Sequence, residues 1–274
     1  MTDLLELAVS AHGGLERWNK VKSIKGAASI TGAIWFIKSK GDALKDVVMK
    51  VEPKQERLTM ELTGQDKRSI FQPSRVTIER MDGTVITARD DPEKSFAGHQ
   101  LSTPWDDIHV AYFSGEALWT YLTPFLYTYE GFVTEEIADI RVDGETWRRL
   151  RVTFPDYVKS HTREQISCFG PDGLLRRHDY TVDILGRATG LNYASEYRDV
   201  GGLIFPGETP HLRLGGRLSA GQGTVARRHR HARHHPALAE TQTNVYPFAG
   251  PAGGETAGAR SRKRPDSEFI TKTR

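Results

Sequence analysis

The sequence predicts a mainly β protein of the α+β class, in which a curved antiparallel sheet meanders around one long, aromatic-rich helix. Short segments of alternating apolar residues, separated by tight turns, lie on both sides of the chain's centre. Between them, residues 105–132 hold nine of the chain's 25 aromatic residues, and so many large apolar side chains require a dry environment. The repeated helices that a parallel α/β fold needs are missing from the sequence pattern.

The spacing of apolar residues inside the aromatic segment predicts the helix. They recur as on one helical face, at Ile108, Ala111, Tyr112, Gly115, Leu118, Trp119 and Leu122. Asp106 and Asp107 stand at its start, where acidic side chains cap free N–H groups and meet the positive end of the helix dipole. Pro124 ends it, because its ring cannot continue the hydrogen-bond ladder. The aromatic side chains either fill a core or line a ligand cavity, and the sequence leaves both interpretations open.

The chain before this helix is predicted to begin with a short helix over residues 3–17, broken at Gly13-Gly14. The apolar period then changes to two, and branched and aromatic residues become frequent, as in strands. Asp82-Gly83 is a two-residue hairpin signal. The strands predicted in this half are residues 21–31, 33–39, 46–52, 56–63, 68–72, 75–80 and 84–88.

Strands resume after the aromatic segment, with turns predicted at Asp143-Gly144 and Pro171-Asp172-Gly173. The predicted strands are residues 136–142, 146–154, 161–169, 174–182 and 192–199. In the second of these, one face is expected to be apolar and to carry Trp147, Leu150, Val152 and Phe154. A sheet with one wet and one apolar face fits a half-barrel with a lipid-like interior. It fits equally a sheet packed solidly on its helix.

Composition and charge predict a cytoplasmic protein without membrane-spanning segments. The single cysteine, Cys168, excludes an internal disulfide and fits a reducing compartment. No apolar run approaches the roughly 18 residues of a membrane span. The N-terminus lacks the basic region of a secretory signal and carries acidic residues inside its apolar segment.

The chain is expected to divide into a ligand-binding-like domain, residues 1–206, and a basic, low-complexity tail, residues 207–274. The tail holds 12 Lys and Arg against 5 Asp and Glu, which leaves 26 against 30 of the chain's 38 and 35 for residues 1–206. Three interpretations of the tail stay open. It is an out-of-frame translation, in which the Arg-His alternation replaces an Asp-Ile strand; a natural disordered tail; or a functional basic arm.

Three short motifs resemble the lipoprotein-localisation-factor-like (LolA/LppX-like) half-barrel superfamily. They are AVSAHGGLERWNKVKSIKG at residues 8–26, VDGETWRRLRVTFP at 142–155 and EYRDVGGLIFP at 196–206. The resemblance spans residues 8–206 and implies a half-open antiparallel barrel, closed by helices, with a hydrophobic cavity for acyl chains or similar ligands. It implies no catalytic residues. The chain departs from that pattern in lacking a signal or lipobox and in its C-terminal end, so lipoprotein trafficking is not expected.

Few residues point to catalysis. His178 and Tyr180 are expected to share one strand face and are the best acid–base candidates, although an ordinary strand histidine explains His178 as well. Cys168 is expected to be a buried, inert thiol. The nucleophile-elbow, phosphate-loop, dinucleotide and paired-cysteine motifs are missing, and we expect no metal and no cofactor.

The sequence therefore favours a non-catalytic protein that binds a hydrophobic small molecule or lipid between sheet and helix. The candidate lining residues are Trp35, Trp105, Tyr112, Trp119, Phe125 and Trp147. The alternatives are an enzyme or accessory factor acting on an apolar substrate in the same cavity, and a vestigial or frameshifted product. Nucleic-acid binding and integral membrane association are not expected, and the sequence does not determine the oligomeric state.

Overall fold

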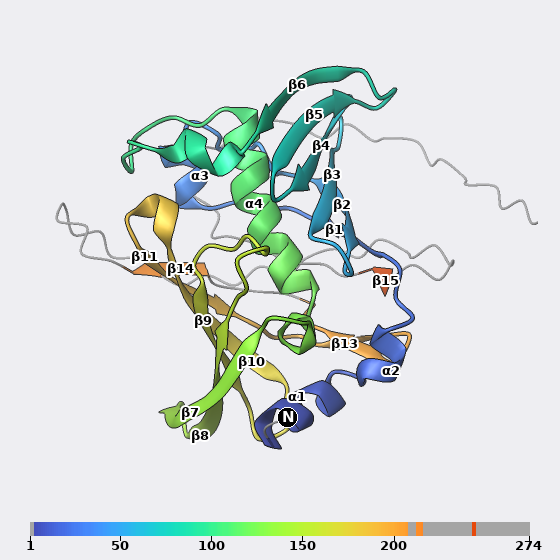
Figure 1. Cartoon of the computed structure of the whole chain (residues 1–274), viewed down its shortest axis with the longest axis vertical. Helices are drawn as coiled ribbons and strands as arrows, with labels where there is room; N and C mark the ends of the chain where they lie inside the picture. Colours follow the sequence, from blue (N-terminus) through green and yellow to red (C-terminus); the bar gives the residue numbers. More distant parts are fainter. Residues whose placement is uncertain (1–2, 208–211, 216–242, 245–274) are drawn as a thin grey trace, which may run out of the picture.

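Two antiparallel sheets enclose one long central helix in the computed structural model, which describes residues 3–207, 212–215 and 243–244. The helix, α4 (Asp107–Leu122), runs along the molecule between the sheets (Figure 1). It contacts strands β3, β4 and β5 of the first sheet, and its Tyr121 side chain donates a hydrogen bond to Tyr180 of the second sheet. This arrangement confirms the predicted class of curved antiparallel strands wrapped around an aromatic-rich helix.

The first sheet is a meander in which each strand from β1 to β6 pairs with the next along the chain, and β15 (Thr243–Asn244) adds a parallel edge beside β1. Its other strands are β1 (Ile24–Ala28), β2 (Val47–Glu52), β3 (Arg57–Leu62), β4 (Lys67–Gln72), β5 (Arg75–Arg80) and β6 (Val85–Asp90). Alternate residues of β2 and β3 are buried in the core, as the period of two predicts.

The second sheet has the strand order β14-β11-β10-β9-β8-β7. Its strands are β7 (Val133–Val142), β8 (Glu145–Thr153), β9 (Glu164–Phe169), β10 (Leu175–Val182), β11 (Ala188–Tyr193) and β14 (Leu212–Gly215). β11 begins four residues before the predicted strand 192–199. A small hairpin, β12 (Arg198–Val200) with β13 (Leu203–Phe205), follows it.

Helix α4 starts as its sequence predicts. The Asp106 carboxylate accepts a hydrogen bond from the His109 backbone N–H at 2.9 Å, and His109 Nδ1 accepts one from the Asp106 N–H at 3.2 Å. This reciprocal capping satisfies two donors that the first turn leaves free. Nearly every residue of α4 is buried, because the helix has a sheet on either side. The apolar face seen in the sequence is only part of its buried surface.

The short helices confirm one prediction and correct another. α1 (Asp3–Ala11) and α2 (Leu15–Trp18) flank the break at Gly13-Gly14. Residues 33–39, predicted as a strand, instead contain the helix α3 (Ala33–Ile37). A run of five apolar residues has no alternation to separate strand from helix, and here Ile34 and Trp35 are buried while Phe36 is 65% exposed. The 3₁₀ turns are η1 (Pro92–Phe96), η2 (Leu126–Thr128) and η3 (Asp183–Leu185).

Most of the predicted tail, residues 207–274, lies outside the described residues, so its three interpretations stay predictions. Its described part, β14 and β15, pairs with β11 and β1. No helix in the described ranges combines the length and apolar character needed to cross a bilayer.

Candidate functional site

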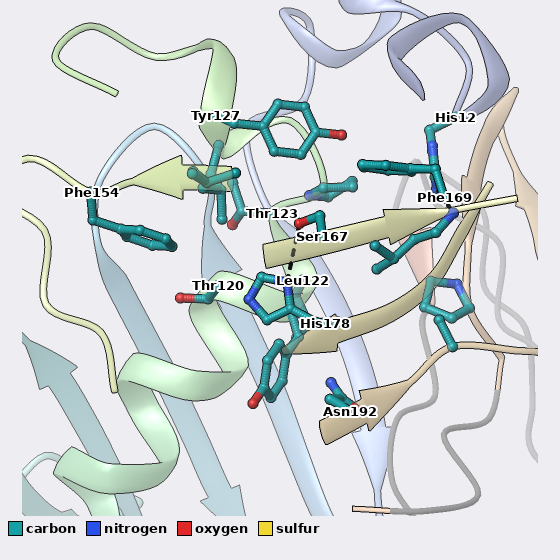
Figure 2. A pocket seen from close by; sticks show the side chains of 17 residues that line it. His12, Thr120, Leu122, Thr123, Tyr127, Phe154, Ser167, Phe169, His178 and Asn192 are labelled. Atoms are coloured by element: carbon teal, nitrogen blue, oxygen red, sulfur yellow. Dashed lines mark hydrogen bonds between the residues drawn. The ribbon is translucent and has the colours of Figure 1, made fainter. Parts of the chain in front are cut away.

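A small cavity of about 70 Å³ lies between the C-terminal half of α4, the loop that follows it and the inner face of the second sheet. Figure 2 shows side chains from these elements converging on one space. Its lining is mostly apolar, with a few polar groups among the hydrocarbon: His12, Thr120, Tyr121, Leu122, Thr123, Pro124, Leu126, Tyr127, Val152, Phe154, Ser167, Phe169, Leu175, His178, Asn192, Ala194 and Pro206. We call this space the sheet–helix cavity.

Strand register places the polar wall of the cavity. Leu150 of β8 is paired with Ser167 of β9, Ser167 with His178 of β10, and His178 with Asn192 of β11. Residues paired across antiparallel strands point to the same face. These four side chains therefore form one row across the inner face of the sheet, and all four are buried.

His178 is held by hydrogen bonds on both ring nitrogens. Nε2 lies against Gln165 Oε1, and Nδ1 is 3.2 Å from Ser167 Oγ (Figure 2). Complete burial lowers the pKa of His178 to about 4, since a charged imidazole is disfavoured away from water. The ring is therefore neutral near pH 7 and is a poor proton acceptor there.

Two polar atoms of the cavity wall are left without partners. Thr123 Oγ1 and Asn192 Oδ1 are buried and make no hydrogen bond to any described residue. A buried polar atom left unpaired costs about 1–3 kcal/mol, so such atoms are uncommon in folded proteins. Both residues line the cavity, so these two unpartnered atoms lie buried in its wall.

Two further pairs of buried polar side chains involve α4. Tyr121 donates to Tyr180 with 2.6 Å between the hydroxyl oxygens, and burial raises the pKa of Tyr180 to about 12. Farther along α4, Glu116 lies 2.6 Å from His161 Nδ1, and both side chains are almost fully buried. Burial raises the pKa of Glu116, while His161 opposes that shift.

None of the six predicted lining residues lines the sheet–helix cavity. Trp35 and Trp105 pack edge-to-face, with ring centroids 6.3 Å apart, in an aromatic cluster at the N-terminal end of α4. Tyr112 packs on Phe71 of β4, and Phe125 is fully buried against Trp18. These four predicted residues fill the core and line neither of the two pockets described. Their role in ligand binding stays a prediction.

Trp119 borders a second and larger space. An open cleft of about 530 Å³ lies beside it, lined by Leu15, Asn19, Lys54, Gln55, Glu56, Gln72, Pro73, Trp119, Thr128, Tyr129, Tyr157 and Val158. The indole Nε1 donates to the backbone carbonyls of Glu52 and Gln55, at 3.1 and 2.9 Å. Trp119 therefore ties α4 to the β2–β3 turn at the edge of this cleft, which we call the Trp119 cleft.

Trp147 lies on the opposite face of the second sheet, so its predicted place beside Leu150 is wrong. Residues an odd number of positions apart in a strand point to opposite faces. Trp147 therefore shares a face with Arg149, and the guanidinium of Arg177 lies 5.5 Å from its ring centroid. Val152 and Phe154 do face inward and line the cavity.

The predicted pair His178 and Tyr180 is brought together, with ring centroids 5.8 Å apart, but only His178 lines the cavity. Thr123, Ser167 and Asn192 had no signal in the sequence beyond their polarity within apolar segments. Among the described residues, no group of three or more His, Cys, Asp or Glu side chains is arranged to hold a metal ion.

Comparison with known proteins gives only distant structural similarities. No family model matches the chain, and no curated protein matches it. Among solved structures, it is similar to a DUF1329 family protein from Desulfovibrio piger, with 11% identity and a TM-score of 0.43, over 74% of this chain and 82% of that one. A LolA superfamily protein from Nitrosomonas europaea is similar at 11% identity and a TM-score of 0.39, over 74% and 81% of the two chains. The second of these solved structures is described as belonging to the superfamily that the three sequence motifs resemble.

Proposed function

We propose that the protein binds a hydrophobic small molecule or lipid in the sheet–helix cavity, without chemical change of the ligand. The observation that carries the proposal is an apolar-walled cavity that contains two unpartnered acceptors, Thr123 Oγ1 and Asn192 Oδ1. A few polar groups placed in a mainly apolar wall are typical of ligand sites. The ligand is therefore an apolar molecule with one hydroxyl or amide donor at its inserted end.

The volume of the sheet–helix cavity limits the size of the ligand. About 70 Å³ is half of the roughly 150 Å³ of a dry apolar cavity that admits benzene. The cavity as it stands accepts a short alkyl segment with its polar tip, and a longer chain requires its wall to move.

The alternative of catalysis in this cavity has weaker support. His178 is neutral and held on both ring nitrogens, and Tyr180 keeps its proton up to about pH 12. A general acid or base works best with a pKa near the working pH. Neither residue meets that condition.

The cytoplasmic location predicted from the sequence is part of this proposal and stays open to test.

The proposal is tested with 1-hexanol, a neutral chain with one hydroxyl donor, by following methyl NMR shifts of Leu122, Leu126 and Val152. We expect saturable shifts in these three residues, and their loss in Val152→Phe, which fills the cavity. Val133→Phe is the matched control, since Val133 is 63% exposed on β7. Shifts that never saturate, or that persist unchanged in Val152→Phe, contradict the proposal.

Native mass spectrometry of the full chain after mild extraction supplies the natural ligand. A co-purified lipid or apolar molecule that Val152→Phe loses and Val133→Phe keeps identifies the occupant. Conversion of that molecule on incubation with the protein favours the catalytic alternative. Loss of this conversion in His178→Ala places the reaction in the sheet–helix cavity.

A further inference from the structure

On one side of the Trp119 cleft, hydrogen bonds from aromatic side chains hold the β2–β3 turn. Trp119 Nε1 donates to two carbonyls of this turn. Tyr129 Oη donates to the Pro53 carbonyl at 2.9 Å and accepts from Trp18 Nε1 at 2.9 Å. Trp119 of α4 and Tyr129, which follows η2, thus bind this turn directly, and Trp18 of α2 supports Tyr129. Ligand sites gain affinity when their walls are already ordered before binding.

At this cleft, one oxygen of the Glu56 carboxyl group is hydrogen-bonded and the other is not. Its Oε2 accepts from the Lys159 backbone N–H at 2.8 Å, which ties the turn to the β8–β9 loop. Its Oε1 is buried and has no partner among the described residues. Glu56 lines the cleft, so this unpartnered oxygen lies buried in the cleft wall.

Lys54 adds a positive charge at the same cleft. Its ammonium lies 5.3 Å from the Tyr129 ring centroid and 5.8 Å from that of Trp18, and it donates to Asn19 Oδ1 at 3.1 Å. None of these contacts neutralises the charge. Leu15, Pro73 and Val158 provide apolar wall beside it. The volume of about 530 Å³ falls in the usual range of small-molecule sites, roughly 300–1,000 Å³.

We propose that the Trp119 cleft is a second ligand site, which binds a small organic acid with one carboxylate on an apolar body. The ligand carboxylate accepts a hydrogen bond from the Glu56 carboxyl and is neutralised by the Lys54 ammonium. Its apolar body lies against Leu15, Pro73 and Val158. This site shares no lining residue with the sheet–helix cavity and does not depend on the function proposed there.

Glu56 can donate a hydrogen bond to the ligand carboxylate only when Glu56 is protonated. Burial, together with the charge of Glu116, raises the pKa of Glu56 to about 9, while Lys159 opposes the shift. The neutral acid carries a proton for donation, as an ionised carboxylate does not. The other charged groups nearby are already paired, Lys159 with Glu93 at 2.7 Å and Glu116 with His161 at 2.6 Å. A cationic ligand is disfavoured, because it would meet Lys54 and no ionised acid free to pair with it.

Calorimetric titration of the full chain with octanoate tests the proposal, with 1-octanol as the neutral probe of equal length. We expect octanoate to bind at least about tenfold more tightly than 1-octanol at pH 7, a difference of roughly 1.4 kcal/mol. Lys54→Met lowers octanoate affinity by a similar factor, whereas Lys45→Met, which removes an exposed lysine outside the cleft, leaves it unchanged. Equal affinity for the two probes, or no effect of Lys54→Met, overturns the proposal.

Two variants of Glu56 separate hydrogen bonding from folding. Glu56→Gln keeps a donor at neutral pH, so binding at pH 7 stays within a few-fold, whereas Glu56→Leu loses about tenfold. Between pH 7 and about pH 10 the native protein loses roughly tenfold more affinity than Glu56→Gln, because the glutamate ionises and the amide does not. Lys54 titrates in both proteins and cancels from the comparison. Identical pH profiles overturn the assignment of Glu56.

Val152→Phe distinguishes this site from the sheet–helix cavity. Octanoate binding that survives this variant and depends on Lys54 supports a second site, whether or not 1-hexanol binds in the cavity. Octanoate binding that Val152→Phe abolishes and Lys54→Met leaves intact places the ligand in the cavity and overturns the second site.

Discussion

Gly115 of α4 lies directly against the Phe71 side chain of β4 in the first sheet. A Cβ added there would lie 2.3 Å from Phe71 Cγ, well inside van der Waals contact. In the sequence this glycine is only a weak residue in the middle of a helix, worth about 1 kcal/mol against alanine. The structure explains why a glycine stands at this position, because the helix backbone lies directly against the Phe71 ring. Its backbone needs no unusual conformation, so its small size is what matters.

Gly115→Ala should therefore destabilise the protein, although alanine is the better helix former. We expect a loss of about 1–3 kcal/mol in the free energy of unfolding, the usual cost of overpacking, measured by urea denaturation. Gly32→Ala is the matched control, since its added Cβ meets only Trp35 at 3.8 Å. A Gly115→Ala protein at least as stable as the native one would show that Phe71 moves aside freely.

His178 should make stability fall in acid. Its pKa is about 4 in the folded protein and about 6.5 when unfolded, so the unfolded chain binds the proton more strongly between these values. The free energy of unfolding contributed by His178 is complete above pH 6.5 and declines as the pH falls to 4, by up to about 3 kcal/mol. Urea denaturation at pH 7 and pH 5 measures the change.

His178→Gln is the comparison that isolates this effect. Burial also lowers the pKa of His12, which adds to the acid loss, and the raised pKa of Glu56 acts in the opposite sense over the same range. The pKa shifts of His12 and Glu56 both remain in the His178→Gln protein. The native protein should therefore lose more stability than His178→Gln on acidification. Equal losses in the two proteins would mean that His178 titrates normally.

At the scale of elements, α4 packs between the two sheets. Its capping by Asp106 and its end before Pro124 are local, and the sequence predicted both. Its burial on nearly all sides is not local, because it depends on two sheets that form from distant segments. The strands show the same division. Their turns and alternation were predicted, whereas the helix α3 was missed, since its apolar run fits either structure until its neighbours decide which residues are buried.

Trp119 links two of these elements, and its indole N–H should contribute measurably to stability. Trp119→Phe leaves the carbonyls of Glu52 and Gln55 without this donor, so we expect a loss of about 1–3 kcal/mol in urea denaturation. Trp147→Phe is the control with the same chemical change. Its partner Glu145 also binds Arg176 and is partly exposed, so less is lost. A smaller loss at position 119 than at 147 would contradict this role.

At the scale of the whole molecule, the two sheets leave two separate spaces beside α4. The sheet–helix cavity lies against the second sheet, and the Trp119 cleft lies at the β2–β3 turn. The predicted pocket was a single space lined by aromatic residues. Instead, those aromatic side chains mostly pack against one another at the N-terminal end of α4 and in the core. The cavity forms at the other end, where smaller side chains such as Thr123 and Ser167 leave room.

The sequence by itself determined the fold class, the position of α4, most of the strands and the tight turns between them. These features follow from residue periodicity, capping and turn chemistry, which act over a few neighbouring residues. Only the tertiary structure decided which side chains face a cavity. That outcome depends on strand register, which joined Ser167, His178 and Asn192 in one row and turned Trp147 away. It also depends on how completely large side chains fill the space between layers, which no short stretch of sequence contains.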